Sequence, residues 1–265
     1  MVIDTFVYNG EKDILDIRFN ILYPYVDKFI ICEFEETFSG KRKSKLLLKD
    51  WNEEWTKFID KVDYAFIPKK EYNKYRELAI SSPNTNYGKG AEHWINEFAQ
   101  KESIKDSITD LKDEDIIFIG DVDEIWNPEQ FKSLTLHPAK LKLKVYSYYL
   151  NNRSDEEFWG TIVAQYKDIK GKCLNHLRTN DLPRTQEEFG WHFTSMGGYE
   201  NVKKKLTDSY TNDSYANDWV LNNLKQNING IHDFLGRNFS YIQDDSGWPS
   251  FIKDHKIKYK HLLIP

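Results

Sequence analysis

The chain has 265 residues, 40% of them hydrophobic and 15% aromatic, which is enough apolar surface for a core and argues against disorder. Its net charge of -5 and pI near 5.9 favour neither a nucleic-acid-binding protein nor a polybasic membrane-binding protein. The two cysteines, the lack of a charged leader followed by a long apolar stretch, and the lack of a bilayer-length apolar run predict a cytoplasmic protein with no disulfide framework and no membrane span. We expect one domain over residues 1–265.

The first part of the chain alternates strand and helix patterns. Residues 2–8 and 26–33 are β-prone and apolar, and between them residues 11–22 carry apolar side chains at near-helical spacing. Residues 45–62 predict an amphipathic helix, and residues 64–67 predict another strand. This alternation is typical of the α/β fold class.

The middle of the chain predicts a central strand. Residues 69–90 contain turn-forming pairs and predict an irregular loop before a helix over residues 91–111. The run 115–119 is hydrophobic without alternation, as in strands covered on both faces. The C-terminal half predicts helices over residues 128–134, 200–207 and 216–226 and strands over residues 141–150 and 161–166.

An acidic cluster directly follows this central strand. Asp121 and Asp123 have Asp-x-Asp spacing, and Glu124 comes next. Ligands in open α/β sheets bind beyond the carboxyl ends of the strands, and hard cations such as Mg²⁺ and Mn²⁺ prefer oxygen ligands. The cluster therefore predicts a cation site that meets phosphate oxygens, although a turn, a helix cap or a hydrolase metal site would give the same pattern.

Several blocks of sequence are similar to one family. The strongest block is residues 115–125, a strand followed by Asp-Val-Asp-Glu-Ile, and a second block covers residues 13–40. A third block, residues 190–200, contains Gly-Trp-His and a Gly-Gly pair, and residues 234–237 match more weakly. In order and spacing, these blocks resemble glycosyltransferase family 17, whose best-known member adds the bisecting N-acetylglucosamine to N-glycans.

The resemblance implies a GT-A type fold, Rossmann-like, with a mostly parallel sheet flanked by helices. The nucleotide sugar would bind over residues 1–126 and the acceptor over residues 127–265. It also implies an inverting transfer, in which a base deprotonates the acceptor hydroxyl while Mn²⁺ or Mg²⁺ stabilises the departing nucleoside diphosphate. The expected partners are a UDP-sugar donor, with N-acetylglucosamine as the first candidate sugar, and a glycan acceptor.

Three residues are expected to form the metal site. Asp123 is the expected direct ligand, and Asp121 is a metal or ribose partner. His192 is a candidate for a further metal ligand or a pyrophosphate contact, but it could equally be a hydrogen-bonded, half-buried histidine.

A second set of residues is expected to contact the nucleotide sugar. Several of them follow the second strand, where turn and capping roles are the structural alternative. Lys101 stands where the family often has Arg, and it keeps the charge without the bidentate fork. The full set is Arg18, Glu33, Thr37, Ser39, Lys101 and Asp121.

The catalytic base is expected among three carboxylates. Glu200 matches an acidic position of the family pattern, although a glutamate in the first turn of a helix is also a routine dipole partner. Asp213 and Glu188 are the alternatives. Aromatic side chains at Trp159, Trp191 and Tyr199 are candidate platforms for the acceptor sugar, but core packing would explain them as well.

Two other functions remain open from the sequence. A metal-dependent phosphoester hydrolase would also use the acidic cluster, but it would usually show more histidine and aspartate ligands. A non-catalytic sugar-binding domain would keep the aromatic residues, and the intact Asp121 and Asp123 argue against it.

Overall fold

The computed structural model describes residues 1–81, 92–132, 134, 138–179, 182–209 and 215–264. These residues form an α/β structure around one large sheet, as expected from the sequence. The strands are β1 (Val2–Val7), β2 (Lys28–Phe34), β3 (Val62–Ile67), β4 (Ile116–Asp121), β5 (Glu124–Trp126), β6 (Ala139–Ser147), β7 (Asn152–Ser154), β8 (Phe158–Gln165), β9 (Arg184–Thr194) and β10 (Tyr241–Gln243).

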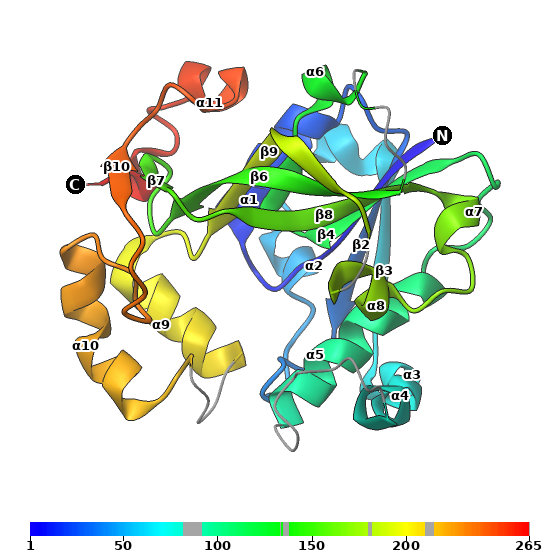
Figure 1. The fold of residues 1–265 in the computed structure, drawn as a ribbon. Coiled ribbons are helices and arrows are strands. Elements are labelled where there is room, and N and C mark those ends of the chain that lie inside the picture. The colour runs from blue at the N-terminus through cyan, green and yellow to red at the C-terminus, as the bar shows by residue number, and fades with distance from the viewer. Residues whose placement is uncertain (82–91, 133, 135–137, 180–181, 210–214, 265) are drawn as a thin grey trace.

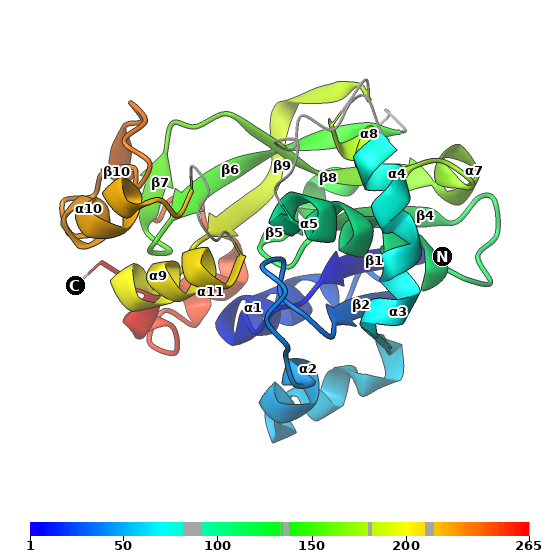
Figure 2. The ribbon, with the colours of Figure 1, turned by 90° about the horizontal axis from the view of Figure 1, so that it is seen from below.

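Helices surround the sheet on both faces (Figures 1 and 2). The α-helices are α1 (Lys12–Leu22), α2 (Leu46–Asp50), α3 (Lys69–Tyr72), α4 (Arg76–Ser81), α5 (Glu92–Ser103), α6 (Pro128–Phe131), α7 (Tyr166–Ile169), α8 (Leu174–Thr179), α9 (Gly198–Ser209), α10 (Asp218–Asn229) and α11 (Ser250–Asp254). Short 3-10 helices are η1 (Glu53–Lys61), η2 (Asn73–Tyr75), η3 (Ile104–Asp106) and η4 (Lys260–Leu262).

The N-terminal half of the sheet is parallel. Strand β1 lies between β2 and β4, and β3 extends the sheet beyond β2, with all four strands pointing the same way. Apolar side chains of α1 pack with Phe6 and Phe118 on one face, while Ala99 of α5 packs with Ile3 and Ile117 on the other. This two-sided burial explains the uninterrupted hydrophobic runs in the sequence. Because the strands are parallel, their carboxyl ends meet at one edge.

Beyond β4 the sheet is extended mainly by antiparallel strands. Strand β8 pairs antiparallel with both β4 and β6, and the sheet continues through β7 to β10. The long strand β9 pairs parallel with β6 and antiparallel with β5. Helices α9 and α10 lie on the side of β7 and β10, and α3, α4, α7 and α8 gather on the opposite side (Figures 1 and 2).

Several local expectations need correction. Residues 69–81 are helical rather than irregular, because Tyr72 is buried against Phe34; the rest of the expected loop, residues 82–90, is outside the described residues. The predicted helix over residues 45–62 is divided into α2 and η1 by the extended Asn52. None of the helices described is long and apolar enough to cross a membrane.

Candidate active site

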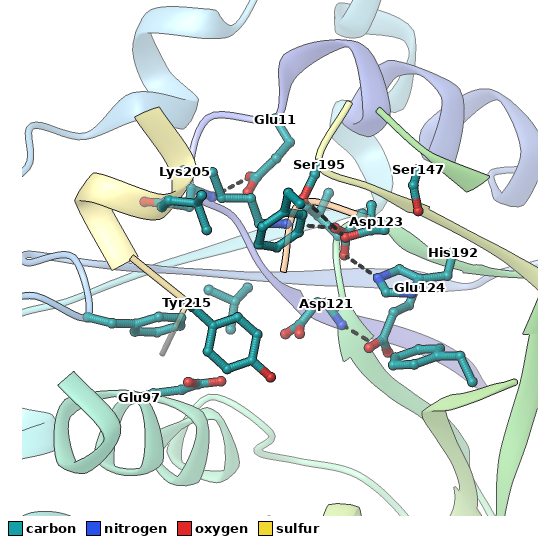
Figure 3. Close-up of a pocket in the computed structure, with 18 of the residues that line it drawn as sticks. Glu11, Glu97, Asp121, Asp123, Glu124, Ser147, His192, Ser195, Lys205 and Tyr215 are labelled. Carbon is teal, nitrogen blue, oxygen red and sulfur yellow. Dashed lines mark hydrogen bonds and ion pairs between the residues drawn. The ribbon is translucent and has the colours of Figure 1, made fainter. Parts of the chain in front are cut away.

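A cavity of about 340 Å³ lies at the carboxyl end of β4. Asp121 is the last residue of β4, Asp123 follows in a tight turn, and Glu124 is the first residue of β5. All three side chains line the cavity, together with groups from α5, α8, β9 and α9 (Figure 3). The sequence-predicted acidic cluster therefore opens into a cavity at the edge where the parallel strands end.

Arg18 of α1 forms hydrogen bonds with the backbone of the acidic turn. Its Nη1 donates hydrogen bonds to the carbonyl oxygens of Asp121, Val122 and Glu124 at 2.9, 3.1 and 2.8 Å. Its Nε and Nη2 donate to both carboxylate oxygens of Asp4 at 2.8 and 2.7 Å. Arg18 is not placed to bind the nucleotide sugar as expected, because the side chain is 0% exposed and all three of its nitrogens donate hydrogen bonds within the protein.

Asp121 is held by two cationic side chains. Lys101 Nζ lies 3.1 Å from Asp121 Oδ2, and Arg178 Nη2 lies 3.3 Å from the same oxygen. Burial opposes ionisation of Asp121, but Lys101 and Arg178 outweigh it and keep the pKa of this carboxyl well below its usual range. Lys101 also contacts Glu97 at 2.7 Å. Arg178 was missed from the sequence, because the short helix α8 carries no recognisable motif.

Asp123 faces His192 and Lys205. Lys205 Nζ lies 3.2 Å from Asp123 Oδ2, and His192 Nε2 lies 3.8 Å from Asp123 Oδ1. The imidazole stacks on Phe158 with ring centroids 4.1 Å apart. Burial lowers the pKa of His192 and keeps the ring neutral. The pairing of β5 with β9, which places Glu124 opposite His192, brings these distant segments together.

The Glu124 side chain packs closely against two glycines, Gly120 and Gly160. A Cβ atom at Gly160 would lie 2.6 Å from Glu124 Cδ, and one at Gly120 would lie 2.8 Å from Glu124 Oε2. The carboxylate accepts hydrogen bonds from the Asp121 amide at 3.3 Å and from Thr161 Oγ1 at 3.2 Å. Burial, together with the neighbouring Asp121, raises the pKa of Glu124 to about 7. The placement of this side chain therefore requires glycine at both positions, because even an alanine would bring a Cβ atom too close.

Of the three nucleotide contacts expected at and after the end of β2, only Thr37 lines the cavity. Thr37 lines the cavity, as expected for a nucleotide contact. Glu33 does not, because it is 0% exposed and accepts hydrogen bonds from the Leu46 and Leu47 amides at the start of α2. Ser39 lies outside the cavity lining and donates to the Asp208 carbonyl at 2.6 Å. For Glu33 and Ser39 the capping and turn alternative is the right one.

Two of the three expected bases lie outside the cavity lining. Glu200 is exposed near the start of α9 and is absent from the lining. Glu188 is also outside, because Arg153 and Lys144 bind its carboxylate at 3.4 and 3.9 Å. Asp213 lies outside the described residues.

The aromatic residues expected to stack on the acceptor sugar also lie outside the cavity lining. Trp191 is 6% exposed and donates its Nε1 hydrogen to the Gly247 carbonyl, and Trp159 donates to the Thr185 carbonyl. Neither these residues nor Tyr199 line the cavity. Its aromatic lining consists instead of Phe38, Tyr148, Phe158, Tyr215 and Phe234.

A second cavity of about 460 Å³ adjoins the first. Asp123, Lys205, Glu11 and Lys43 line both cavities. Glu11 precedes α1 and accepts a hydrogen bond from the Asn9 amide at 2.8 Å. Burial raises the pKa of Glu11 above its usual range. The junction of the two cavities therefore contains Glu11, Lys43 and Lys205 together with Asp123 of the acidic turn.

Comparison with known proteins gives a family match and a structural similarity. The sequence pattern of glycosyltransferase family 17 matches residues 1–210, which include the acidic turn, His192 and Lys205. Comparison with curated protein sequences finds no significant match. Among solved structures, the chain is similar to mouse xyloside xylosyltransferase 1 in its apo form, with 12% identity, a TM-score of 0.34 and coverage of 66% of this chain and 70% of that chain. The match over residues 1–210 shows that the chain belongs to glycosyltransferase family 17.

Proposed function

We propose that this glycosyltransferase is an inverting, metal-dependent enzyme of GT-A type that moves a sugar from a UDP-sugar to a hydroxyl of a glycan. The observation that carries the proposal is the convergence of Asp121, Asp123 and His192 on one cavity at the carboxyl end of β4. N-acetylglucosamine is the first donor sugar to test. Residues 1–126 would supply most of the donor site, and the second half would supply most of the acceptor site.

The chemistry of the side chains fits a divalent cation at Asp123. Asp123 supplies hard carboxylate oxygens, and His192 is neutral, which is the form that binds metals. The 3.8 Å between Asp123 Oδ1 and His192 Nε2 is too long for a hydrogen bond, and the buried His192 Nδ1 has no hydrogen-bond partner among the residues that the structure describes. Among the described residues, no group of three His, Cys, Asp or Glu side chains is arranged to hold an ion. When bound, the cation would neutralise charge on the departing diphosphate.

Cationic side chains of the chain itself support the same step. Lys205 pairs with Asp123 and Lys43 lines the same cavity, while Lys101 and Arg178 are bound to Asp121. In a partly dehydrated cavity, preorganised positive groups stabilise developing negative charge more strongly than they would in water. We infer that Lys205 and Lys43 contact the diphosphate and that Lys101 and Arg178 keep Asp121 ionised and correctly placed.

Thermal unfolding with a nucleotide panel tests the donor site. A nucleotide at about 100 times its Kd adds about 2.7 kcal/mol of stability, or about 5 to 10 °C in Tm for a chain of this size. We expect UDP and one UDP-sugar to produce this shift only with Mn²⁺ or Mg²⁺, and Asp123→Ala to abolish it. The matched control is Asp245→Ala, which removes an exposed aspartate that also pairs with a lysine, Lys256, at 2.9 Å.

The outcomes separate the alternatives. A shift that survives in Asp123→Ala would contradict the metal assignment. If no nucleoside diphosphate shifts the wild-type Tm with any metal, the donor site is wrong and a hydrolase or a non-catalytic sugar-binding domain becomes the better interpretation.

A further inference from the structure

Glu97 has a carboxylate oxygen with no partner in the described part of the structure. The residue lies on α5 and is 8% exposed. Its Oε1 lies 2.7 Å from Lys101 Nζ, whereas Oε2 is buried and accepts no hydrogen bond. A buried acceptor left unsatisfied costs free energy, and most such groups in folded proteins find a partner. Because Glu97 lines the cavity, a bound ligand is the natural source of the missing donor.

The chemistry of Glu97 limits what that ligand group can be. An ionised carboxylate only accepts hydrogen bonds, so its partner must carry a hydroxyl or an N–H. A phosphate is excluded as the direct partner, because two negative groups in a partly dehydrated cavity repel each other. Of the parts of a nucleotide sugar, the transferred sugar is the richest in hydroxyl groups and is joined directly to the diphosphate.

The position of Glu97 matches the transferred sugar. Lys101 Nζ lies between Glu97 and Asp121, 2.7 Å from the first carboxylate and 3.1 Å from the second, so Glu97 is next to the proposed diphosphate site. Figure 3 shows Glu97 on α5, on the side of Asp121 away from Glu11 and Lys205. A sugar attached to a diphosphate at Asp121 and Asp123 would come within reach of this helix.

We propose that Glu97 Oε2 accepts a hydrogen bond from a hydroxyl of the transferred sugar and thereby selects the donor sugar. The inference rests on the donor site proposed above. Glu97 is then a specificity-determining residue, because a site built to bind a hydroxyl rejects an analogue that lacks it. A purely structural role, in which Glu97 only holds Lys101 against Asp121, would affect the diphosphate rather than the sugar.

Calorimetry with UDP, UDP-N-acetylglucosamine, UDP-glucose and UDP-galactose in the presence of Mn²⁺ distinguishes these roles. We expect Glu97→Ala to weaken binding of the preferred UDP-sugar by about tenfold or more, as for a lost hydrogen bond to a charged group, and to weaken binding of UDP, which the lost Glu97–Lys101 pair can affect, much less. Glu97→Gln keeps the shape and one acceptor oxygen, so its loss should be smaller. The control is Glu92→Gln, which removes an exposed carboxylate of the same helix and should change neither Kd.

Deoxy analogues of the preferred donor give a second readout. The analogue that lacks the contacted hydroxyl should bind the wild type as weakly as the parent donor binds Glu97→Ala, and combining both changes should cause no further loss. Equal losses for UDP and UDP-sugar in Glu97→Ala, or no loss for either, would overturn the inference while leaving the proposed function standing. If the wild type binds no UDP at all, the proposed function fails and the inference fails with it.

Discussion

Replacing Arg18 by methionine is expected to lower the free energy of unfolding by about 3 to 5 kcal/mol, the usual cost of removing one partner from a buried ion pair. Arg18 and Asp4 are both 0% exposed, so the substitution leaves Asp4 charged and uncompensated in the core. The carbonyl oxygens of Asp121, Val122 and Glu124 also lose the hydrogen bonds that Arg18 donates. Urea unfolding measures the difference, provided that the m-value stays constant.

Three further variants sharpen this test. Lys28→Met removes an exposed ion pair, Lys28 with Asp63 at 3.1 Å, and should cost no more than about 1 kcal/mol. The double variant Arg18→Met with Asp4→Leu should lose less than the sum of its two single changes, because no isolated charge remains. Arg18→Lys should recover only part of the stability, since an ammonium cannot reproduce the fork that spans Asp4 and three carbonyls. A loss in Arg18→Met no larger than in Lys28→Met would refute the role of Arg18.

The parallel half of the fold could be predicted because its signals are local. Strand β4 is a hydrophobic run buried on both faces, and α1 carries its apolar residues at helical spacing, so a short window of sequence is enough to identify each. Strands β5 and β9 were missed, because β5 has only three residues and is stabilised by pairing with a segment more than 60 residues away. The same pairing places His192 beside Asp123, which spacing alone could not have established.

The site residues, too, could be predicted from the sequence only where their signals are local. Asp121 and Asp123 could be identified because their spacing and the preceding strand are both visible in sequence. Arg178 and Lys205 could not, because each pairs with an aspartate 57 or 82 positions away and has no motif around it. Glu33 illustrates the opposite error, since a carboxylate near a strand end looks like a ligand contact but here satisfies the first amides of α2.

Because Glu200 and Glu188 lie outside the cavity lining, Glu11 becomes a candidate base. Glu11 lines both cavities and lies close to Asp123 and Lys205, beside the proposed diphosphate site (Figure 3). Glu156 also lines the first cavity, but Arg237 binds its carboxylate at 3.1 Å. Burial raises the pKa of Glu11, which brings this carboxylate closer to the range that suits a general base. We therefore propose Glu11 as the base.

Glu11→Gln is expected to lower kcat by about 10² to 10⁴, the usual contribution of a general base, without changing the Kd of UDP or the UDP-sugar. Release of UDP from the UDP-sugar with water as acceptor measures this rate before the natural acceptor is known. Glu200→Gln, which alters the exposed carboxylate favoured by the sequence, is the matched control and should retain full activity.

The pH dependence provides an independent check on Glu11. A base must be deprotonated to act, and its pKa is raised, so wild-type kcat/KM should fall as the pH drops through a value above the usual range of a glutamate. This acid limb should be absent from the residual activity of Glu11→Gln, because glutamine does not titrate. The opposite result would identify Glu200 as the base: the acid limb remains in Glu11→Gln, whereas Glu200→Gln loses most of its activity and shows no acid limb in what remains. In that case α9 must move to bring Glu200 into the cavity.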